Sequence, residues 1–414
     1  MAAPNEKYFS SSGKGNKPYI SHGLPFHEAC KHHAENTFGA LRVYVVVSSS
    51  ISKTQAFSDL QKTLGSRLTG VRHGMAPHTP WKDVFEVTRD IVDKKSDLVI
   101  TLGGGSLTDG VKLARLFAAN GITHFEDIQR IREKCKIWAP HPSEDEVKPA
   151  TIPCINVPTT LSGGEYTKIG GATDTEGDGH KTILQHESML ADIVILDPAL
   201  TVSTPERFWL STGVRGVDHC CEGLYENLPD ASPETSADLM AALEKLLVNL
   251  LRTKASWEDP EARLQEMLVV RECPRAINNG LGASHGIGHQ LGPLGVGHGE
   301  TSCVMLSHVL KYNWQHGDAH VRRNLQRIID VFWKDPSIVD VLEARGLKKE
   351  SADPGDLVGA FVSALGLPTT LGHFGIGEDK FDSLAEVALH DWCTEENPIK
   401  LDKEQVLSIL RLAA

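Results

Sequence analysis

Four short runs of almost uninterrupted apolar residues mark the first half of the chain. They cover residues 41–47, 98–102, 152–157 and 193–197. Such runs are typical of strands that are buried on both faces of a parallel sheet. The stretches between them, such as 55–64 and 81–93, carry apolar residues at helical spacing. This alternation predicts an α/β fold with right-handed crossovers.

The second half of the chain has a different pattern. Beyond Asp197 and Pro198 the strand-like runs stop, and apolar residues recur at helical spacing within 234–253, 357–365 and 403–412. This spacing predicts helices that bury one face. We therefore expect two domains with a cleft between them: an α/β nucleotide-binding domain at 1–198 and an all-α substrate and catalytic domain at 199–414.

A glycine-rich turn follows the second predicted strand. Gly103, Gly104 and Gly105 come directly before a helical pattern, and Ser106 could cap that helix, with Asp109 in a capping-box position. Free backbone N–H groups at a helix N-terminus attract anions, so the turn predicts a phosphate site. The alternative is a tight strand-to-helix turn that binds no ligand.

A second loop of small and hydroxyl residues follows the third predicted strand, from Pro158 to Thr167. Two such loops after separate strands favour a dinucleotide, because open α/β sheets bind ligands at the carboxyl ends of their strands. The chain contains neither G-x-G-x-x-G nor G-x-x-x-x-G-K-[ST]. Ser48 to Ser50 follow the first predicted strand without an acidic residue for a ribose hydroxyl, so the choice between NAD and NADP stays open.

Composition narrows the class of protein. With 414 residues, 40% hydrophobic and 23% charged, the chain has a globular composition, and its net charge of −12 argues against nucleic-acid or anionic-membrane partners. No apolar run is long enough for a transmembrane helix, and the first residues lack a signal-peptide core, so we expect a cytoplasmic protein. The eight cysteines form no C-x-x-C pair and are expected to be buried and reduced.

A glycine- and histidine-rich stretch runs from residue 282 to residue 300. His285 and His289 are four residues apart, so a helix would place both on one face, although glycine disfavours helices. Such a helix would let another group approach its backbone closely, and a glycine-rich loop is the alternative. With His298 and His219, this stretch offers the imidazoles that zinc or iron needs. Residues 282–286 also fit G-x-S-x-G, but no strand-like run precedes this hydrolase motif.

Taken in order, these motifs resemble the iron-containing (group III) alcohol dehydrogenase family. The resemblance rests on Gly103-Gly104-Gly105-Ser106-x-x-Asp109, Pro158-Thr159-Thr160, Asp197-Pro198 and the His285…His289…His298 segment. It implies a dehydroquinate-synthase-like two-domain fold, hydride transfer with NAD or NADP, and a homodimer. It also implies cofactor-binding positions at Gly104, Gly105, Ser106, Asp109, Thr159, Thr160 and Lys181.

The resemblance also assigns the histidines, with one departure. His219, His285 and His298 match the metal-binding histidines of the metal-dependent members, and His289 matches a histidine that handles protons. Those members carry a fourth ligand, an aspartate four residues before the first histidine, where this chain has Arg215. A protonated guanidinium has no lone pair for a metal.

Maleylacetate reductases are a branch of the family that lacks this aspartate. The chain shares with them a second loop shorter by one residue and a Glu300-Thr301 pair after the third histidine. The resemblance therefore implies an NAD(P)H-dependent reductase that converts 2-maleylacetate to 3-oxoadipate in aromatic-compound catabolism. At the position of Arg215, that branch is expected to carry asparagine.

Without a metal, other groups must stabilise the developing oxyanion. We hypothesise that Arg215, with one or more of His219, His285 and His289, takes this role, that His289 acts as general acid, and that Arg215 also pairs with a substrate carboxylate. The alternative for Arg215 is a salt bridge with Asp218 or Glu222. Alternatives for the protein are a metal-dependent alcohol dehydrogenase acting on a small alcohol or aldehyde, or a lyase of the dehydroquinate-synthase type.

Overall fold

The first half of the chain folds around a seven-stranded sheet with the strand order β1-β2-β9-β6-β5-β3-β4. This computed structural model describes residues 2–13, 15–76, 79–175 and 181–414. Neighbouring strands are parallel, except that β1 runs antiparallel to β2. The strands are β1 (Lys7–Ser10), β2 (Tyr19–His22), β3 (Val43–Val47), β4 (Leu68–His73), β5 (Leu98–Gly103), β6 (Cys154–Pro158) and β9 (Ile193–Leu196).

The four predicted strands are confirmed as β3, β5, β6 and β9, which are consecutive in the middle of the sheet. Every residue in them is buried, which explains why their sequence reads as apolar runs. The register aligns Val45 with Ile100 and Ile100 with Ile155. Two further strands, β7 (Ile169–Thr173) and β8 (Lys181–Gln185), form a separate antiparallel hairpin.

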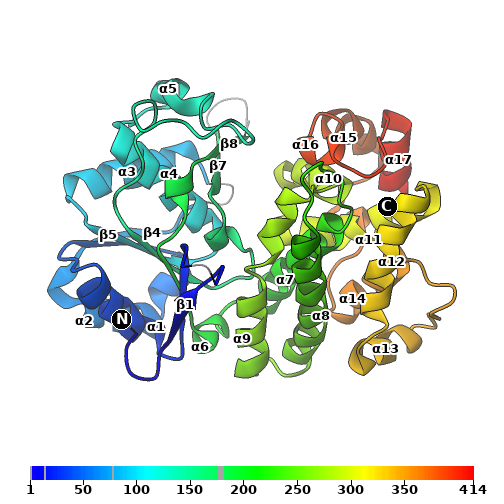
Figure 1. Ribbon diagram of the computed structural model, residues 1–414, viewed down its shortest axis with the longest axis horizontal. Coiled ribbons are helices and arrows are strands. Elements are labelled where there is room, and N and C mark those ends of the chain that lie inside the picture. The colour runs from blue at the N-terminus through cyan, green and yellow to red at the C-terminus, as the bar shows by residue number, and fades with distance from the viewer. Residues whose placement is uncertain (1, 14, 77–78, 176–180) are drawn as a thin grey trace. The chain divides into compact units, whose positions relative to one another are not determined.

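Helices cover both faces of the large sheet (Figure 1). On one face α1 (Phe26–His32) and α2 (Gln55–Leu64) share a core with Val43, Val45 and Leu98. On the other face α3 (Trp81–Asp93) and α4 (Gly105–Asn120) pack with Tyr44 and Val99. The helices predicted at 55–64 and 81–93 are therefore confirmed as α2 and α3. Two short helices, α5 (Gln129–Arg132) and α6 (Pro198–Thr201), complete this half.

The strand order reverses beside β3. From β3 the chain first moves outward to β4, then returns to β5 on the other side of β3 and continues to β6 and β9. Open α/β sheets bind ligands at the carboxyl ends of the strands beside such a reversal. Gly103 ends β5 at this point. The doubly wound sheet therefore places the predicted phosphate turn where a nucleotide is expected.

The second half of the chain is helical, as predicted, and no strand occurs in its described residues, 204–414. The chain divides into two compact units, Met1–Ser203 and Thr204–Ala414. The second unit holds α7 (Glu206–Gly223), α8 (Pro233–Ala255), α9 (Pro260–Val269), α10 (Ala283–Leu291), α11 (His298–His316), α12 (Ala319–Phe332), α13 (Pro336–Glu343), α14 (Pro354–Ala364), α15 (Phe381–Ala388), α16 (Trp392–Glu395) and α17 (Lys403–Leu412).

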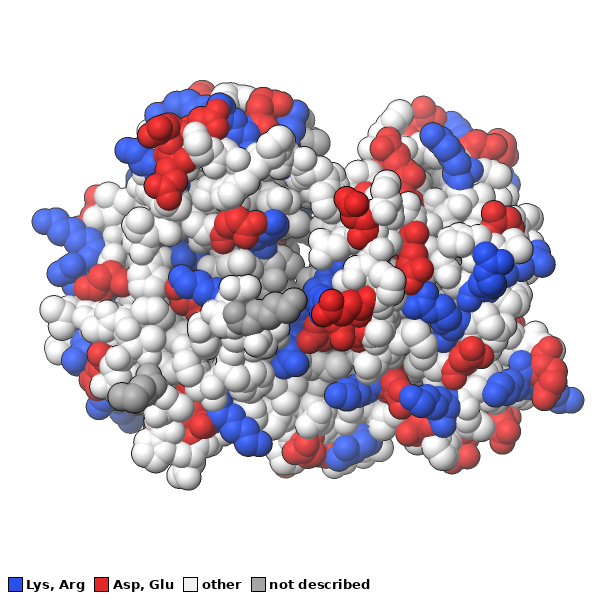
Figure 2. All heavy atoms as spheres, in the orientation of Figure 1, with Lys and Arg blue, Asp and Glu red and all other residues white. Residues whose placement is uncertain are grey.

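The surface and the cysteines agree with the composition. On the face drawn in Figure 2, lysine and arginine side chains lie interspersed with aspartate and glutamate side chains. All eight cysteines are free thiols and are buried, as predicted. Of the helices in the described residues, none is both long and apolar enough to cross a membrane.

Candidate active site

The predicted phosphate turn forms a polar cradle in the first unit. Gly104 is the extended N-cap of α4, so the first N–H groups of this helix point out of its N-terminus. A Cβ atom added at Gly104 would lie 3.3 Å from Thr160 Cγ2, and one at Gly105 would lie 3.0 Å from Ser162 Oγ. The hydroxyls of Thr160 and Ser162 are buried and have no hydrogen-bond partner in the described part of the chain. We call these four residues the anion cradle.

Orphaned hydroxyls beside a helix N-terminus fit an anionic ligand, because a phosphate oxygen would accept their hydrogen bonds. The anion cradle therefore fits the pyrophosphate of a dinucleotide. Thr159, the other predicted hydroxyl residue of the second loop, is buried, and its N–H donates to the Gly103 carbonyl at 3.1 Å. Lys181, another predicted cofactor residue, is exposed and begins β8.

The predicted cap by Ser106 is wrong. The helix begins at Gly105, so Ser106 lies inside the first turn, and the N-cap residue, Gly104, has no side chain that could cap the helix. Asp109 has other partners: its Oδ2 accepts from the Gly171 N–H at 3.4 Å, and its Oδ1 lies 3.5 Å from Lys112 Nζ. The physical reason is the turn itself, since the extended Gly104 occupies the N-cap two residues earlier than the serine.

Lys112 connects the two loops of this unit. Its ammonium group is buried and donates to the Gly164 carbonyl, to Thr167 Oγ1 at 2.8 Å and to the Ile169 carbonyl at 2.7 Å. Because Lys112 belongs to α4, the helix whose N-terminus forms part of the anion cradle also holds the loop that faces the cradle. Sequence spacing gave no sign of this contact, since its partners are more than 50 residues away.

In the second unit, the glycine- and histidine-rich stretch forms a helix, α10, as predicted, and the loop alternative is wrong for residues 283–291. The groups that approach the backbone of α10 closely are side chains of this same chain. A Cβ atom at Gly286 would lie 2.0 Å from Thr394 Oγ1, and one at Gly288 would lie 3.1 Å from Thr301 Oγ1. The glycines therefore let α16 and α11 pack closely against α10.

Arg215 lies on α7 and is only 3% exposed. Its Nη1 donates to Thr301 Oγ1 at 3.3 Å and to Ser302 Oγ at 3.1 Å, and it lies 4.0 Å from Asp218 Oδ2. Its Nε is buried and has no partner among the described residues. The Nε–H group of Arg215 is therefore a donor with no acceptor among the described residues.

Two buried carboxylates hold this region together. Asp218 Oδ2 accepts from Ser284 Oγ at 2.9 Å and also from the Ser302 hydroxyl. Glu222 accepts from the N–H groups of Gly282 and Ser284, at 2.8 and 2.9 Å. The ion pair foreseen between Arg215 and Asp218 is present at 4.0 Å, but Arg215 makes no ion pair with Glu222.

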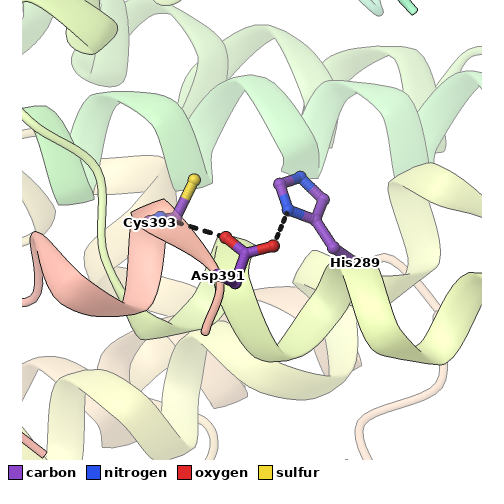
Figure 3. Close-up of side chains that lie close together, drawn as sticks. All are labelled: His289, Asp391 and Cys393. Atoms are coloured by element: carbon purple, nitrogen blue, oxygen red, sulfur yellow. Dashed lines mark hydrogen bonds and ion pairs between the residues drawn. The ribbon is translucent and has the colours of Figure 1, made fainter. Parts of the chain in front are cut away.

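The predicted histidines differ in environment. His219 Nδ1 donates to the Arg215 carbonyl at 2.8 Å, and its ring centroid lies 4.5 Å from that of His285. His285 Nδ1 donates to Glu222 Oε2 at 2.7 Å, while its Nε2 is buried without a partner in the described residues. His289 Nδ1 donates to Asp391 Oδ2 at 2.9 Å (Figure 3).

Their pKa values shift in opposite directions. Burial, followed by repulsion from His285 and Arg215, lowers the pKa of His219 well below its ordinary value. Burial and Arg215 would also lower the pKa of His285, but Asp218 and Glu222 outweigh them and raise it. Burial raises the pKa of Asp218, but His285 and Arg215 overcome this effect and lower it. The site therefore holds a neutral His219 beside a His285 that favours the charged form.

Sequence reasoning named Asp218 and Glu222 only as partners for Arg215, and it missed Ser302, Thr394 and Asp391. The contacts of Glu222 with His285, of Ser302 with Asp218 and of Asp391 with His289 span 63, 84 and 102 positions in the chain. The hydrolase reading of G-x-S-x-G is wrong. A 3₁₀ helix at Cys273–Asn278 lies upstream instead of a strand, and the Ser284 hydroxyl is buried against Asp218.

Comparisons with known proteins agree with this architecture. Residues 24–198 match the model of the iron-containing alcohol dehydrogenase family, and residues 209–414 match that of the C-terminal domain of the Fe-containing alcohol dehydrogenase family. The chain is 50% identical to "Dehydrogenase FUM7" of Gibberella moniliformis (strain M3125 / FGSC 7600) over the full length of both proteins. The chain belongs to the iron-containing alcohol dehydrogenase family.

More distant family members include maleylacetate reductases. "Maleylacetate reductase 1" of Cupriavidus pinatubonensis (strain JMP 134 / LMG 1197) is 25% identical, over 88% of this chain and 87% of that protein. The crystal structure of maleylacetate reductase from Rhizobium sp. strain MTP-10005 superposes with a TM-score of 0.73 at 24% identity, covering 100% of this chain and 98% of that one. This likeness confirms the predicted two-part fold.

The metal that the family name implies does not fit the residues at this position. A buried guanidinium stands where the metal-dependent members have a carboxylate, and it would repel a dication. His298 is exposed on the first turn of α11. Among the described residues, neither His219 nor His298 belongs to any group of three donor atoms within 4.8 Å of one another. The histidines His219, His285 and His298 therefore do not form the expected ligand set.

Proposed function

We propose that this oxidoreductase is an NAD(P)H-dependent reductase of the maleylacetate type. Its substrate would be a small carboxylate whose carbon–carbon double bond is conjugated to a ketone. The observation that carries the proposal is Arg215, a buried cation held by Thr301, Ser302 and Asp218, with Nε left without a partner in the described chain. The similarity to maleylacetate reductase 1 supports the same substrate class.

The residues that would hold the cofactor are those of the anion cradle, together with Ser106, Asp109, Thr159 and Lys181. The chemistry that a bound nicotinamide dinucleotide supplies is hydride donation. Three serines, Ser48 to Ser50, follow β3, and none of them is an acidic residue that would bind a ribose 2′-hydroxyl or repel a 2′-phosphate. We expect the enzyme to accept both.

Arg215 and the histidines would act on the substrate in this scheme. Reduction of the enone places negative charge on the ketone oxygen, and fixed donors aimed at that oxygen lower the barrier. Arg215 Nε and His285 Nε2 are buried donors with no acceptor among the described residues. Either a substrate carboxylate or the developing oxyanion would satisfy Arg215, because a guanidinium pairs with both.

His219 and His289 would complete the scheme. Because His219 Nδ1 donates its proton to the Arg215 carbonyl, His219 Nε2 carries a lone pair and cannot donate to the oxyanion, so the donors in this scheme are Arg215 and His285. His289 would give a proton to the alkene carbon next to the ketone, which becomes a CH₂ group, while the hydride adds to the other alkene carbon. The hydride and this proton together convert the double bond into a single bond.

The test is a turnover assay with purified protein. We expect maleylacetate to oxidise NADH or NADPH, with a rate that a chelator leaves unchanged. Arg215→Met should lower kcat/KM by about 100-fold or more, the usual effect of removing a donor aimed at a developing charge. The matched control is Arg207→Met on the same helix, because the side chain of Arg207 is 54% exposed and pairs with Glu300.

Two results would overturn the proposal. One is stoichiometric iron or zinc in the purified protein, with activity on simple alcohols or aldehydes that a chelator abolishes. This result would indicate a metal-dependent alcohol dehydrogenase. The other is an Arg215→Met variant that is folded by circular dichroism and has an unchanged kcat/KM.

A further inference from the structure

We propose that Asp391 is a positioning residue that orients His289 for proton transfer. Asp391 comes from a C-terminal turn that lies 102 residues beyond His289 in the chain. Asp391 directly precedes α16, which packs against α10, the helix that carries His285 and His289. The inference rests on the proposed function, since it assigns the residue that prepares His289 for its part in the reduction.

The two side chains meet through a well-formed contact. The Nδ1 atom of His289 lies 2.9 Å from Asp391 Oδ2, and the two rest against each other in Figure 3. The same carboxylate oxygen accepts from Gln290 Nε2 at 3.3 Å. The other oxygen accepts from the Cys393 N–H at 3.0 Å and so caps α16. One oxygen of Asp391 therefore binds His289 and Gln290, and the other caps α16.

This contact decides which nitrogen of His289 can react. A carboxylate can only accept, so Nδ1 must carry a proton and Nε2 is left to bind or release one. The carboxylate also stabilises the imidazolium that exists just before the proton is given away. The Cys393 thiol also lies near His289, but burial keeps it protonated and neutral. The other titratable groups that act on His289 are Arg215 on α7 and His285 on α10. Both oppose a second proton on His289, so Asp391 is the group that favours it.

Exposure also favours His289 as the histidine that exchanges protons. Its side chain is 30% exposed and Asp391 is 12% exposed, whereas His285 is only 2% exposed. Water can therefore return a proton to His289 after each turnover. His285 is enclosed between Glu222 and Asp218, which suits a group that keeps its charge.

Close packing fixes Asp391 in place. Thr394, three residues further on, lies against Gly286 of α10, so the turn cannot move away from the helix without losing this contact. His289, Asp391 and Cys393 could also be regarded as a metal site, because one donor atom from each lies within 4.8 Å of the others. The fully buried thiol of Cys393 argues against this, because burial raises its pKa well above the ordinary value and keeps it protonated.

The first experiment is a double-mutant cycle with the full chain. In Asp391→Asn, the amide oxygen can still cap α16, but the NH₂ group faces His289 and forces the opposite tautomer. We expect kcat to fall by about 1,000-fold or more with little change in KM, by analogy with the effect of a wrong histidine tautomer in a catalytic triad. In a His289→Gln background, the same change should have no further effect, because Asp391 acts through His289.

A matched control separates capping from positioning. Asp353 caps α14 in the same unit by accepting the Asp356 N–H at 2.9 Å. Asp353→Asn should leave kcat unchanged. If Asp391→Asn lowers kcat as strongly in the His289→Gln background as in the wild type, Asp391 acts through the fold alone and the inference is wrong.

The second experiment needs no turnover. Diethyl pyrocarbonate acylates an unprotonated imidazole nitrogen, and mass spectrometry of the peptides gives the rate for each histidine. Acylation of His289 should be at least tenfold slower in Asp391→Asn than in wild type, with His316 as internal reference. An unchanged rate overturns the inference. A slower rate in a protein that reduces no enone supports the contact with Asp391 and overturns only the proposed function.

Discussion

Replacing Gly286 by alanine tests whether α10 contains glycine so that α16 can pack against it. An added Cβ atom would lie 2.0 Å from Thr394 Oγ1 and 2.7 Å from the Thr394 backbone nitrogen. Rotating the threonine side chain relieves the first contact but not the second, because the second atom belongs to the backbone. The turn that carries Asp391 must therefore move away from α10.

The expected cost follows from two opposing effects. Overpacking a buried contact costs about 1–3 kcal/mol, whereas replacing glycine by alanine inside a helix gains about 0.5–1 kcal/mol. Gly286→Ala should therefore lower the free energy of unfolding by about 1 kcal/mol, and by no more than about 2.5 kcal/mol. It should also reduce kcat, because Asp391 moves with Thr394.

The matched control is Gly359→Ala in α14, where an added Cβ atom would meet its nearest neighbour, Ser307 Cβ, at an ordinary 3.7 Å. This variant should gain about 0.5–1 kcal/mol and keep its activity. Urea unfolding followed by circular dichroism compares the midpoints and slopes of both variants with wild type. If Gly286→Ala is stabilised as much as Gly359→Ala, close packing does not explain the glycine.

Three further predictions concern single buried groups. Burial raises the pKa of Glu266, on α9, from 4.5 to about 8, so the folded protein keeps a proton that the unfolded chain releases. The free energy of unfolding should therefore fall by about 1.4 kcal/mol per pH unit as the pH rises from 4.5 to about 8. Glu266→Gln should reduce this dependence of the free energy on pH. If thermal unfolding shows the same pH dependence in the variant and in wild type, the prediction is wrong. Thr160→Val should weaken NADPH binding about tenfold in a fluorescence titration, since it removes an orphaned donor to phosphate, and equal affinity would argue against the anion cradle. Lys112→Met should lower the free energy of unfolding by about 2 kcal/mol or more, because three partly buried acceptors lose their donor. A thermal midpoint equal to wild type would contradict this.

The fold could be predicted wherever burial leaves a simple pattern in the sequence. The central strands β3, β5, β6 and β9 are buried on both faces and read as apolar runs. Strands β1 and β4, at the edges of the sheet, were not predicted, because most of their residues are only partly buried and they include polar and charged side chains. Helix α4 was expected, but its first residue depends on the extended conformation of Gly104, which no spacing rule reveals.

The candidate site could be predicted only in part, for a related reason. Arg215 and His219 on α7, and His285 and His289 on α10, lie four residues apart within their helices, so local spacing finds them. Asp391 reaches His289 only when the chain has folded, and local periodicity contains no information about a contact across 102 residues. His298 shows the reverse case: it is close in sequence to the other histidines but lies exposed at the start of another helix.

The buried ammonium group of Lys112 has a consequence for the energetics of cofactor binding. It attaches the second loop to the helix that forms the other wall of the anion cradle, through Gly164, Thr167 and Ile169. The two walls are thus ordered when the protein folds, before any ligand arrives. A flexible loop would lose conformational entropy on binding, and that loss would weaken the affinity. In this protein the loop is already ordered in the folded state. The entropy is therefore not lost on binding, and more of the interaction with the phosphates contributes to the binding free energy.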